Sequence, residues 1–127
     1  MAKSNYLENK VLDHFLGTSS TSAPSNVYVG LFTSDPTDAG SGTEVSGSGY
    51  TRKVATFSSA SGGSTSNSSA IEFTASGGAF GTCTHFGIFD AVSSGNLLYH
   101  GALTASKTIA DTDTLKISAT GLTVTES

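Results

Sequence analysis

The sequence predicts a mainly β fold, an antiparallel sandwich or jelly-roll-like barrel with one short amphipathic helix at the N-terminus. Serine, threonine and glycine are abundant, whereas charged residues make up only 13% of the 127 residues. This balance favours a loop-rich β protein over a charged helical or disordered chain. Short apolar segments alternate with turn signals, as in sandwiches and barrels, and an apolar share of 36% is enough for a thin core.

The first predicted element is a helix over residues 5–16. Asn5 with Glu8 three residues later forms a candidate capping pair, Ser4 is a competing cap, and Gly17 is placed to end the helix. A helix this short is marginal alone, so its apolar face is expected to dock on the β domain or on another subunit. At helical spacing that face contains Leu7, Val11, Leu12, Phe15 and Leu16.

Seven or eight strands are predicted after this helix. Residues 27–33 are apolar on both faces, which is typical of a strand buried on both sides. Residues 80–90 are expected to form a long central strand with a bulge at its glycines, followed by a hairpin turn at 93–96 and a second strand. The other predicted strands are an edge strand within 50–58, a strand around 71–74, and two short strands at 115–118 and 122–125.

A long loop joins the first two strands, from Ser34 to Gly49. Asp35-Pro36 opens a turn, and several glycines keep the connection irregular. A loop longer than a strand connection needs is either functional or a contact surface. We therefore expect it to be mobile in the isolated protein and to become ordered on assembly. A second serine-rich stretch, residues 58–69, is expected to be flexible, and its sequon at Asn67 is interpreted as a chance loop tripeptide.

Length and composition limit the number of domains and the classes of partner. We expect one domain overall, with the helix in residues 1–17 and the β domain in 27–127. A net charge of −4 gives no basic footprint for nucleic acid, and the adjacent Arg52 and Lys53 are interpreted as solvated edge residues. With a single cysteine, no signal peptide and no apolar run of about 18 residues, we expect a chain made in a reducing cytoplasm and no membrane partner.

The sequence offers no convincing catalytic, cofactor or metal site. Cys83 and His85 are two residues apart, which on a regular strand puts a thiol and a base on one face, but no orienting group or oxyanion site accompanies them. Adding His100 to this pair does not produce a paired zinc-ligand spacing. The acidic residues Asp35, Asp38, Glu44, Asp111 and Asp113 do not follow a calcium-loop pattern and are interpreted as turn-forming residues.

Four segments together carry a family resemblance. They are SNYLENKVLDHFLG at residues 4–17, LFTSDPTDAGSGTEVSGSGYTR at 31–52, HFGIFD at 85–90 and GNLLYHGAL at 95–103. With these segments the chain resembles a family of small structural proteins of tailed bacteriophages that are usually labelled tail fibre proteins. The resemblance is looser after Leu103.

The resemblance implies a non-enzymatic virion protein, assembled in the host bacterial cytoplasm and displayed on the particle surface as a tail-fibre adaptor or knob. A capsid decoration protein is the alternative, and a carbohydrate-binding module is a third possibility that the lack of tryptophan disfavours. The expected partners are other virion proteins of the tail or capsid and further copies of the chain, a trimer being one form considered. The candidate interface residues are Tyr6, Leu7, Val11, Phe15, Asp35, Asp38, Val45 and Tyr50.

Overall fold

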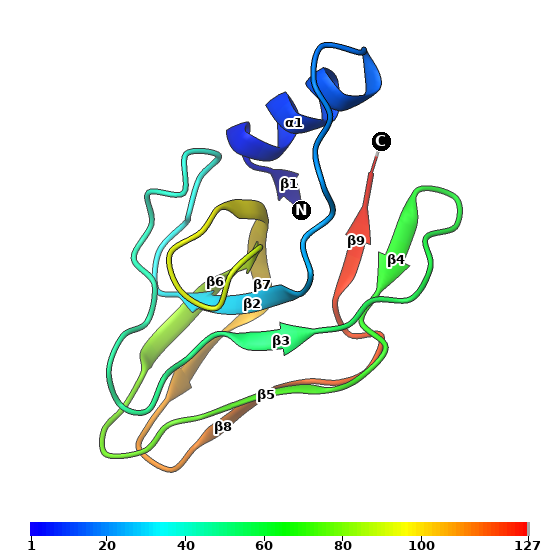
Figure 1. The fold of residues 1–127 in the computed structure, drawn as a ribbon. Helices are drawn as coiled ribbons and strands as arrows, with labels where there is room; N and C mark the ends of the chain where they lie inside the picture. The colour runs from blue at the N-terminus through cyan, green and yellow to red at the C-terminus, as the bar shows by residue number, and fades with distance from the viewer. Residues whose placement is uncertain (127) are drawn as a thin grey trace.

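A computed structural model describes residues 1–126 and shows one helix and nine strands in this part of the chain (Figure 1). The predicted N-terminal helix and most predicted strands are present. The elements in chain order are β1 (Ala2–Lys3), α1 (Asn5–Phe15), β2 (Val27–Phe32), β3 (Lys53–Ala55), β4 (Ser64–Ser66), β5 (Ile71–Thr74), β6 (Gly81–Phe89), β7 (Leu97–Ile109), β8 (Thr114–Ile117) and β9 (Thr123–Thr125).

The strands form one antiparallel sheet of five and two antiparallel pairs. The large sheet has the order β1-β7-β6-β2-β3, and the pairs are β5-β8 and β4-β9. In Figure 1 the β5-β8 pair runs along one end of the molecule, away from α1. The mainly β, antiparallel prediction is thus confirmed, and of the two architectures considered the fold is sandwich-like and is not a closed barrel.

The main core fills the space that the larger sheet shares with the two strand pairs. A second, smaller cluster of Phe32, Phe89 and Leu97 packs apart from the main one. Burial of these apolar side chains is the principal stabilising contribution in a fold of this size. The buried members of the main core are Val29, Leu31, Val45, Ala55, Ile71, Phe73, Ala75, Phe80, Cys83, Phe86, Ile88, Ile109, Leu115, Leu122 and Val124.

The helix begins at a different cap from the predicted pair. Ser4 is the N-cap, and its side-chain oxygen accepts a hydrogen bond from the Leu7 backbone N–H. The prediction of Asn5 as cap was wrong, because Asn5 already lies inside the first turn. At the other end Gly17 has φ +89° and Thr18 N–H donates to the Asp13 carbonyl, so the helix ends as predicted.

The central strands were predicted correctly, but the face on which Cys83 lies was not. β6 lies between β2 and β7, and its pairing with β7 shifts register between Cys83 and His85. Because of this irregularity Cys83 joins the main core with Phe86 and Ile88, whereas strict alternation would put it on the other face.

Two strands were not predicted. β1 pairs with β7, and β4 forms within the serine-rich stretch by pairing with β9. The stretch is anchored by Asn67, which is fully buried: its amide donates to the Ser69 and Ser118 carbonyls and accepts from the Leu122 N–H. Asn67 thus has a structural role in the stretch that was expected to be flexible. Its hydrogen bonds link the serine-rich stretch to the segment that joins β8 and β9.

Candidate interaction surface at the N-terminal helix

The helix presents one half-buried face and one exposed face. Leu7 and Val11 are half-buried, and the helix contacts β7 and β1. The exposed part of its apolar stripe is Leu12, Phe15 and Leu16, with 55%, 76% and 75% of their surfaces accessible. We call these three residues the helix tip. Contiguous large apolar side chains at this exposure are typical of a surface that another molecule covers.

The helix is fixed at its N-terminal end. Ala2 and Lys3 pair with His100 and Tyr99 of β7, and the buried Ser4 hydroxyl donates to the Leu97 carbonyl. These contacts hold the first turn against the large sheet, whereas the last turn carries the helix tip. Figure 1 shows α1 projecting at one end of the molecule, beyond the strands. The tip is therefore presented on a rigid support.

Next to the helix, the long loop supplies the two predicted interface aspartates. The Asp38 carbonyl accepts from the Asn5 N–H, and its carboxylate lies 2.8 Å from His100 Nε2. Asp35 accepts from the Thr37 N–H and lies 3.8 Å from His100 Nδ1. Both aspartates thus form a polar cluster around the buried His100, and their carboxylates remain about half exposed, 59% for Asp35 and 49% for Asp38.

The other two loop residues point inward. Val45 is 5% exposed and belongs to the main core, and its N–H donates to the Leu31 carbonyl. The Tyr50 ring packs on Phe73, while its hydroxyl donates to Glu44 at 2.6 Å and accepts from the Leu31 N–H. Burial, followed by the hydrogen bond to the Glu44 carboxylate, raises the pKa of Tyr50 above its usual range. The expectation that the loop offers Val45 and Tyr50 to a partner does not fit these positions.

Arg52 holds the long loop in place, a role that the sequence analysis did not identify. Its Nε and Nη2 each donate to the Glu44 carboxylate at 2.9 Å, and its guanidinium carbon lies 3.5 Å from the centroid of the Phe89 ring. Nη1 donates to the carbonyls of Ala91 and Ser94 in the β6–β7 hairpin. The side chain is only 9% exposed, so the interpretation of Arg52 as a solvated edge residue was wrong. No spacing rule links Glu44 to Arg52, because their pairing depends on how the loop closes.

Cys83 and His85 do not form a thiol and base pair. Cys83 is fully buried in the main core, and burial raises the pKa of its thiol. His85 pairs in register with Phe32, whose side chain belongs to the second cluster, and its Nδ1 lies 2.8 Å from the Thr84 hydroxyl. The register shift between the two residues separates them onto different faces of the sheet.

The acidic residues singled out in the sequence are engaged in local structure. Asp111 accepts from the Gly77 N–H, and Asp113 accepts from the Ala110 N–H. Within residues 1–126 no group of three or more His, Cys, Asp or Glu side chains is arranged to hold a metal ion. Within the same residues no helix is long and apolar enough to cross a membrane.

The predicted interface residues thus fall into three groups. Tyr6 and Phe15 lie on the exposed surface of the helix, and Lys10 Nζ lies 5.6 Å from the centroid of the Tyr6 ring. Leu7 and Val11 lie on its half-buried face. The loop residues either surround His100 or enter the core. Contact of these residues with another protein stays a prediction.

Comparison with protein families gives a match over most of the chain. A family model described as Podophage GP4 fiber I protein gp80 matches residues 2–125. The match covers nearly the whole chain, including the helix and all the described strands. No curated protein matches the chain.

Proposed function

Since the chain belongs to the phage fibre family of the Podophage GP4 fiber I protein gp80, we propose that it acts on the virion surface as a tail-fibre adaptor or knob. In this role it is a non-enzymatic structural protein that assembles with further copies of itself and with other virion proteins. The family supports the structural role, and the exposed helix tip is the observation that supports assembly.

The energetics favour a covered helix tip. Burying a large apolar side chain contributes about 1.5–3 kcal/mol, so the three side chains of the tip together are a substantial driving force for association. Aromatic and leucine side chains on a rigid element lose little conformational freedom when they dock, and central aromatic residues often dominate the binding energy. Phe15, at 76% exposed, is the expected anchor of the contact.

The particle offers the test of location. Gold-labelled antibody against the protein should decorate purified virions on the tail. Labelling of the capsid shell instead would assign the protein as a capsid decoration protein, the second role that the sequence allows. Absence of the protein from purified particles, measured by mass spectrometry, would contradict the proposed function.

The variant Leu12→Asp with Phe15→Asp tests the helix tip. The substituted side chains contact solvent in the single chain, so the variant should keep its secondary structure and its urea midpoint. It should nevertheless lose incorporation into particles at least tenfold. Val54→Asp is the matched control, because Val54 is 54% exposed and lies on the edge strand β3, which does not contact the helix. Normal incorporation of the double variant would show that the tip does not serve assembly.

A further inference from the structure

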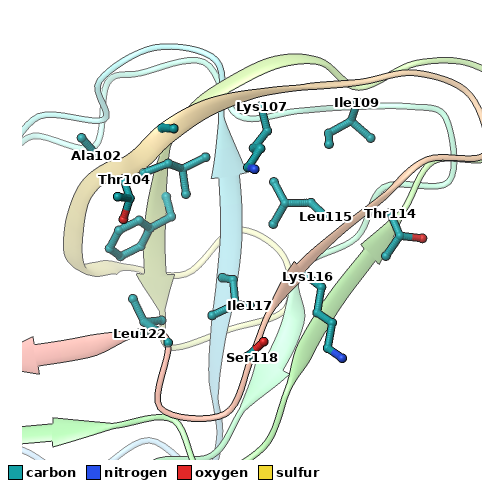
Figure 2. Close-up of a pocket in the computed structure, with 14 residues that line it drawn as sticks. Ala102, Thr104, Lys107, Ile109, Thr114, Leu115, Lys116, Ile117, Ser118 and Leu122 are labelled. Atoms are coloured by element: carbon teal, nitrogen blue, oxygen red, sulfur yellow. The ribbon is translucent and has the colours of Figure 1, made fainter.

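Besides the helix tip, a second accessible apolar surface lies between β7 and β8. It is a cleft of about 410 Å³, which we call the β7–β8 cleft. Figure 2 shows Leu115, Ile117 and Leu122 lining it from one side, with β7 arching over the other. Its apolar lining is completed by Phe86, Leu103 and Ile109, whose side chains belong to or pack against the main core.

The cleft exists because the sandwich is open at this point. β8 pairs only with β5, and the outer edge of β7 pairs only with β1, at Tyr99 and His100. Beyond these residues the pairing of β7 with β6 is interrupted, since residues 103–106 lie between the partners of Cys83 and His85. Such an irregularity bends a strand away from its neighbour. The facing edges of β7 and β8 are consequently unpaired among the described residues.

Residues of opposite charge lie near the helix tip and in the lining of the cleft. Lys107 and Lys116 line the cleft and make no ion pair with any residue in 1–126. Figure 2 shows Lys107 reaching into the cleft. On the helix, Glu8 lies one turn before Leu12, on the same side as the tip, and is exposed without an ion pair in the described chain. One surface is thus an apolar knob with an acid near it, and the other is an apolar cleft with a base near it.

We propose that the helix tip of one copy docks into the β7–β8 cleft of a second copy, with Glu8 of the helix beside Lys107 of the cleft. This inference rests on the proposed function, in which copies of the chain assemble on the virion. It follows a common mode of recognition, in which the apolar face of a helix lies in a hydrophobic groove. Phe15 and Leu16, at the end of the helix, are the side chains that enter the cleft.

The position of the two surfaces determines the type of contact. Figure 1 places α1 and β8 at opposite ends of the molecule. One chain therefore cannot fill its own cleft, and the contact between copies is head to tail. Such contacts close into a ring when the rotation between copies allows it, a trimer being one such ring, and otherwise build an open filament.

Complementation between two defective variants tests the docking. Leu12→Asp with Phe15→Asp removes the knob and keeps the cleft. Ala105→Trp fills the cleft and keeps the knob, since Ala105 is an exposed lining residue of β7. Each variant alone should have the single-chain mass of 12.8 kDa in analytical ultracentrifugation at concentrations where the natural sequence associates. Mixed at equal amounts, they should form a dimer through the one intact knob and the one intact cleft.

Exchanging the charges of Glu8 and Lys107 tests the docking independently. Glu8→Lys or Lys107→Glu alone should weaken association about tenfold, and the two together should restore most of it. The matched control is Lys53→Glu on the edge strand β3, which should leave association unchanged. These substitutions remove no core side chain, so they remain informative if Ala105→Trp does not fold.

Three results would overturn the inference. They are a natural chain that stays at 12.8 kDa up to millimolar concentration, cleft variants that associate normally while helix variants do not, and a mixture that remains monomeric. Gold labelling of particles separates these outcomes from the proposed function. A protein found on virions but lacking this contact would retain the proposed function, whereas absence from particles would remove it.

Discussion

At the scale of single residues, Tyr50, Glu44 and Arg52 show how polar chemistry stabilises a long loop. Glu44 accepts from the Tyr50 hydroxyl and, through both carboxylate oxygens, from Arg52. Gly30 on β2 makes room for this arrangement, because a Cβ there would lie 2.7 Å from Glu44 Oε2 and 2.9 Å from the Tyr50 hydroxyl. The partly buried Glu44 carboxylate thus has two partners and the Arg52 guanidinium has three, so few polar groups are left unsatisfied.

The raised pKa of Tyr50 predicts a loss of stability at alkaline pH. Below pH 10 the phenol is neutral in the folded and the unfolded chain, so its full contribution is present. As the pH rises above 10 the unfolded chain releases the proton first, and the free energy of unfolding falls by up to about 1.4 kcal/mol per pH unit for this group. Urea unfolding between pH 8 and 11 should show a shallower fall for Tyr50→Phe.

The matched control for this measurement is Tyr6→Phe, because Tyr6 lies on the exposed surface of the helix. Tyr6→Phe should keep the alkaline slope of the natural sequence. Tyr99, whose pKa is raised by burial and by the Glu126 carboxylate, remains in both variants and contributes equally to them. Identical slopes for the natural chain and Tyr50→Phe would show that ionisation of Tyr50 does not couple to folding.

At the scale of elements, the loop from Ser34 to Gly49 and the helix α1 differ in how much of each packs within the chain. The loop was expected to be mobile until assembly. In the structure the Thr43 carbonyl accepts from the Thr33 N–H, the Val45 N–H donates to the Leu31 carbonyl of β2, and Val45 is buried. The helix was expected to dock somewhere, and only its inner face does so within the chain. The helix therefore presents its tip to a partner, whereas Val45 of the loop lies in the core.

Replacing residues 40–49 by a short Gly-Ser turn should destabilise the isolated protein. The replacement removes the buried Val45 and leaves Arg52 without its carboxylate. Removing one partner of a fully buried ion pair costs about 3–5 kcal/mol, and this partly buried pair is expected to cost less. Urea unfolding followed by circular dichroism measures the loss. The control replaces residues 22–25, which are all exposed, by Gly-Ser and should change stability little. Equal midpoints for both replacements would mean that the loop does not support the core.

At the scale of the whole molecule, the large sheet and the β5-β8 pair are in contact at one side of the sandwich and are separated by a cleft at the other. β3 contacts β5, so the large sheet and the β5-β8 pair meet there, whereas β7 and β8 diverge around the cleft. Cys83 lies on the central strand β6 and is fully buried. Its thiol therefore reports on opening of the whole fold rather than on local fraying.

The Cys83 thiol should be almost unreactive in the native protein. Because burial both covers the sulfur and raises the pKa of the thiol, labelling with a disulfide reagent at pH 8 should be at least a thousandfold slower than in urea. Val54→Cys in a Cys83→Ser background is the control, since Val54 is 54% exposed on the edge strand β3 and should react at once. Rapid labelling of native Cys83 would indicate that the core between β6 and the β5-β8 pair opens easily.

The sequence by itself determined the class of fold, the limits of α1 to within one residue, and the central strands β2 and β6. These elements have strong local signals, namely an apolar stripe at helical spacing and apolar runs bounded by turns. It also indicated the phage fibre family, which the match over residues 2–125 confirms. Local patterns suffice here because each of these signals is contained in a short stretch of chain.

Only the tertiary structure decided the roles of Arg52, Asn67 and Cys83 and the strands β1 and β4. Arg52 depends on Glu44 and the hairpin carbonyls, Asn67 on residues about 50 positions later, and Cys83 on a register shift. Strand β4 has no apolar pattern of its own and forms because β9 pairs with it. All of these depend on contacts between residues far apart in the chain, which carry no local periodicity. For the same physical reason, the sequence could identify the apolar face of the helix but not which of its side chains the fold leaves exposed.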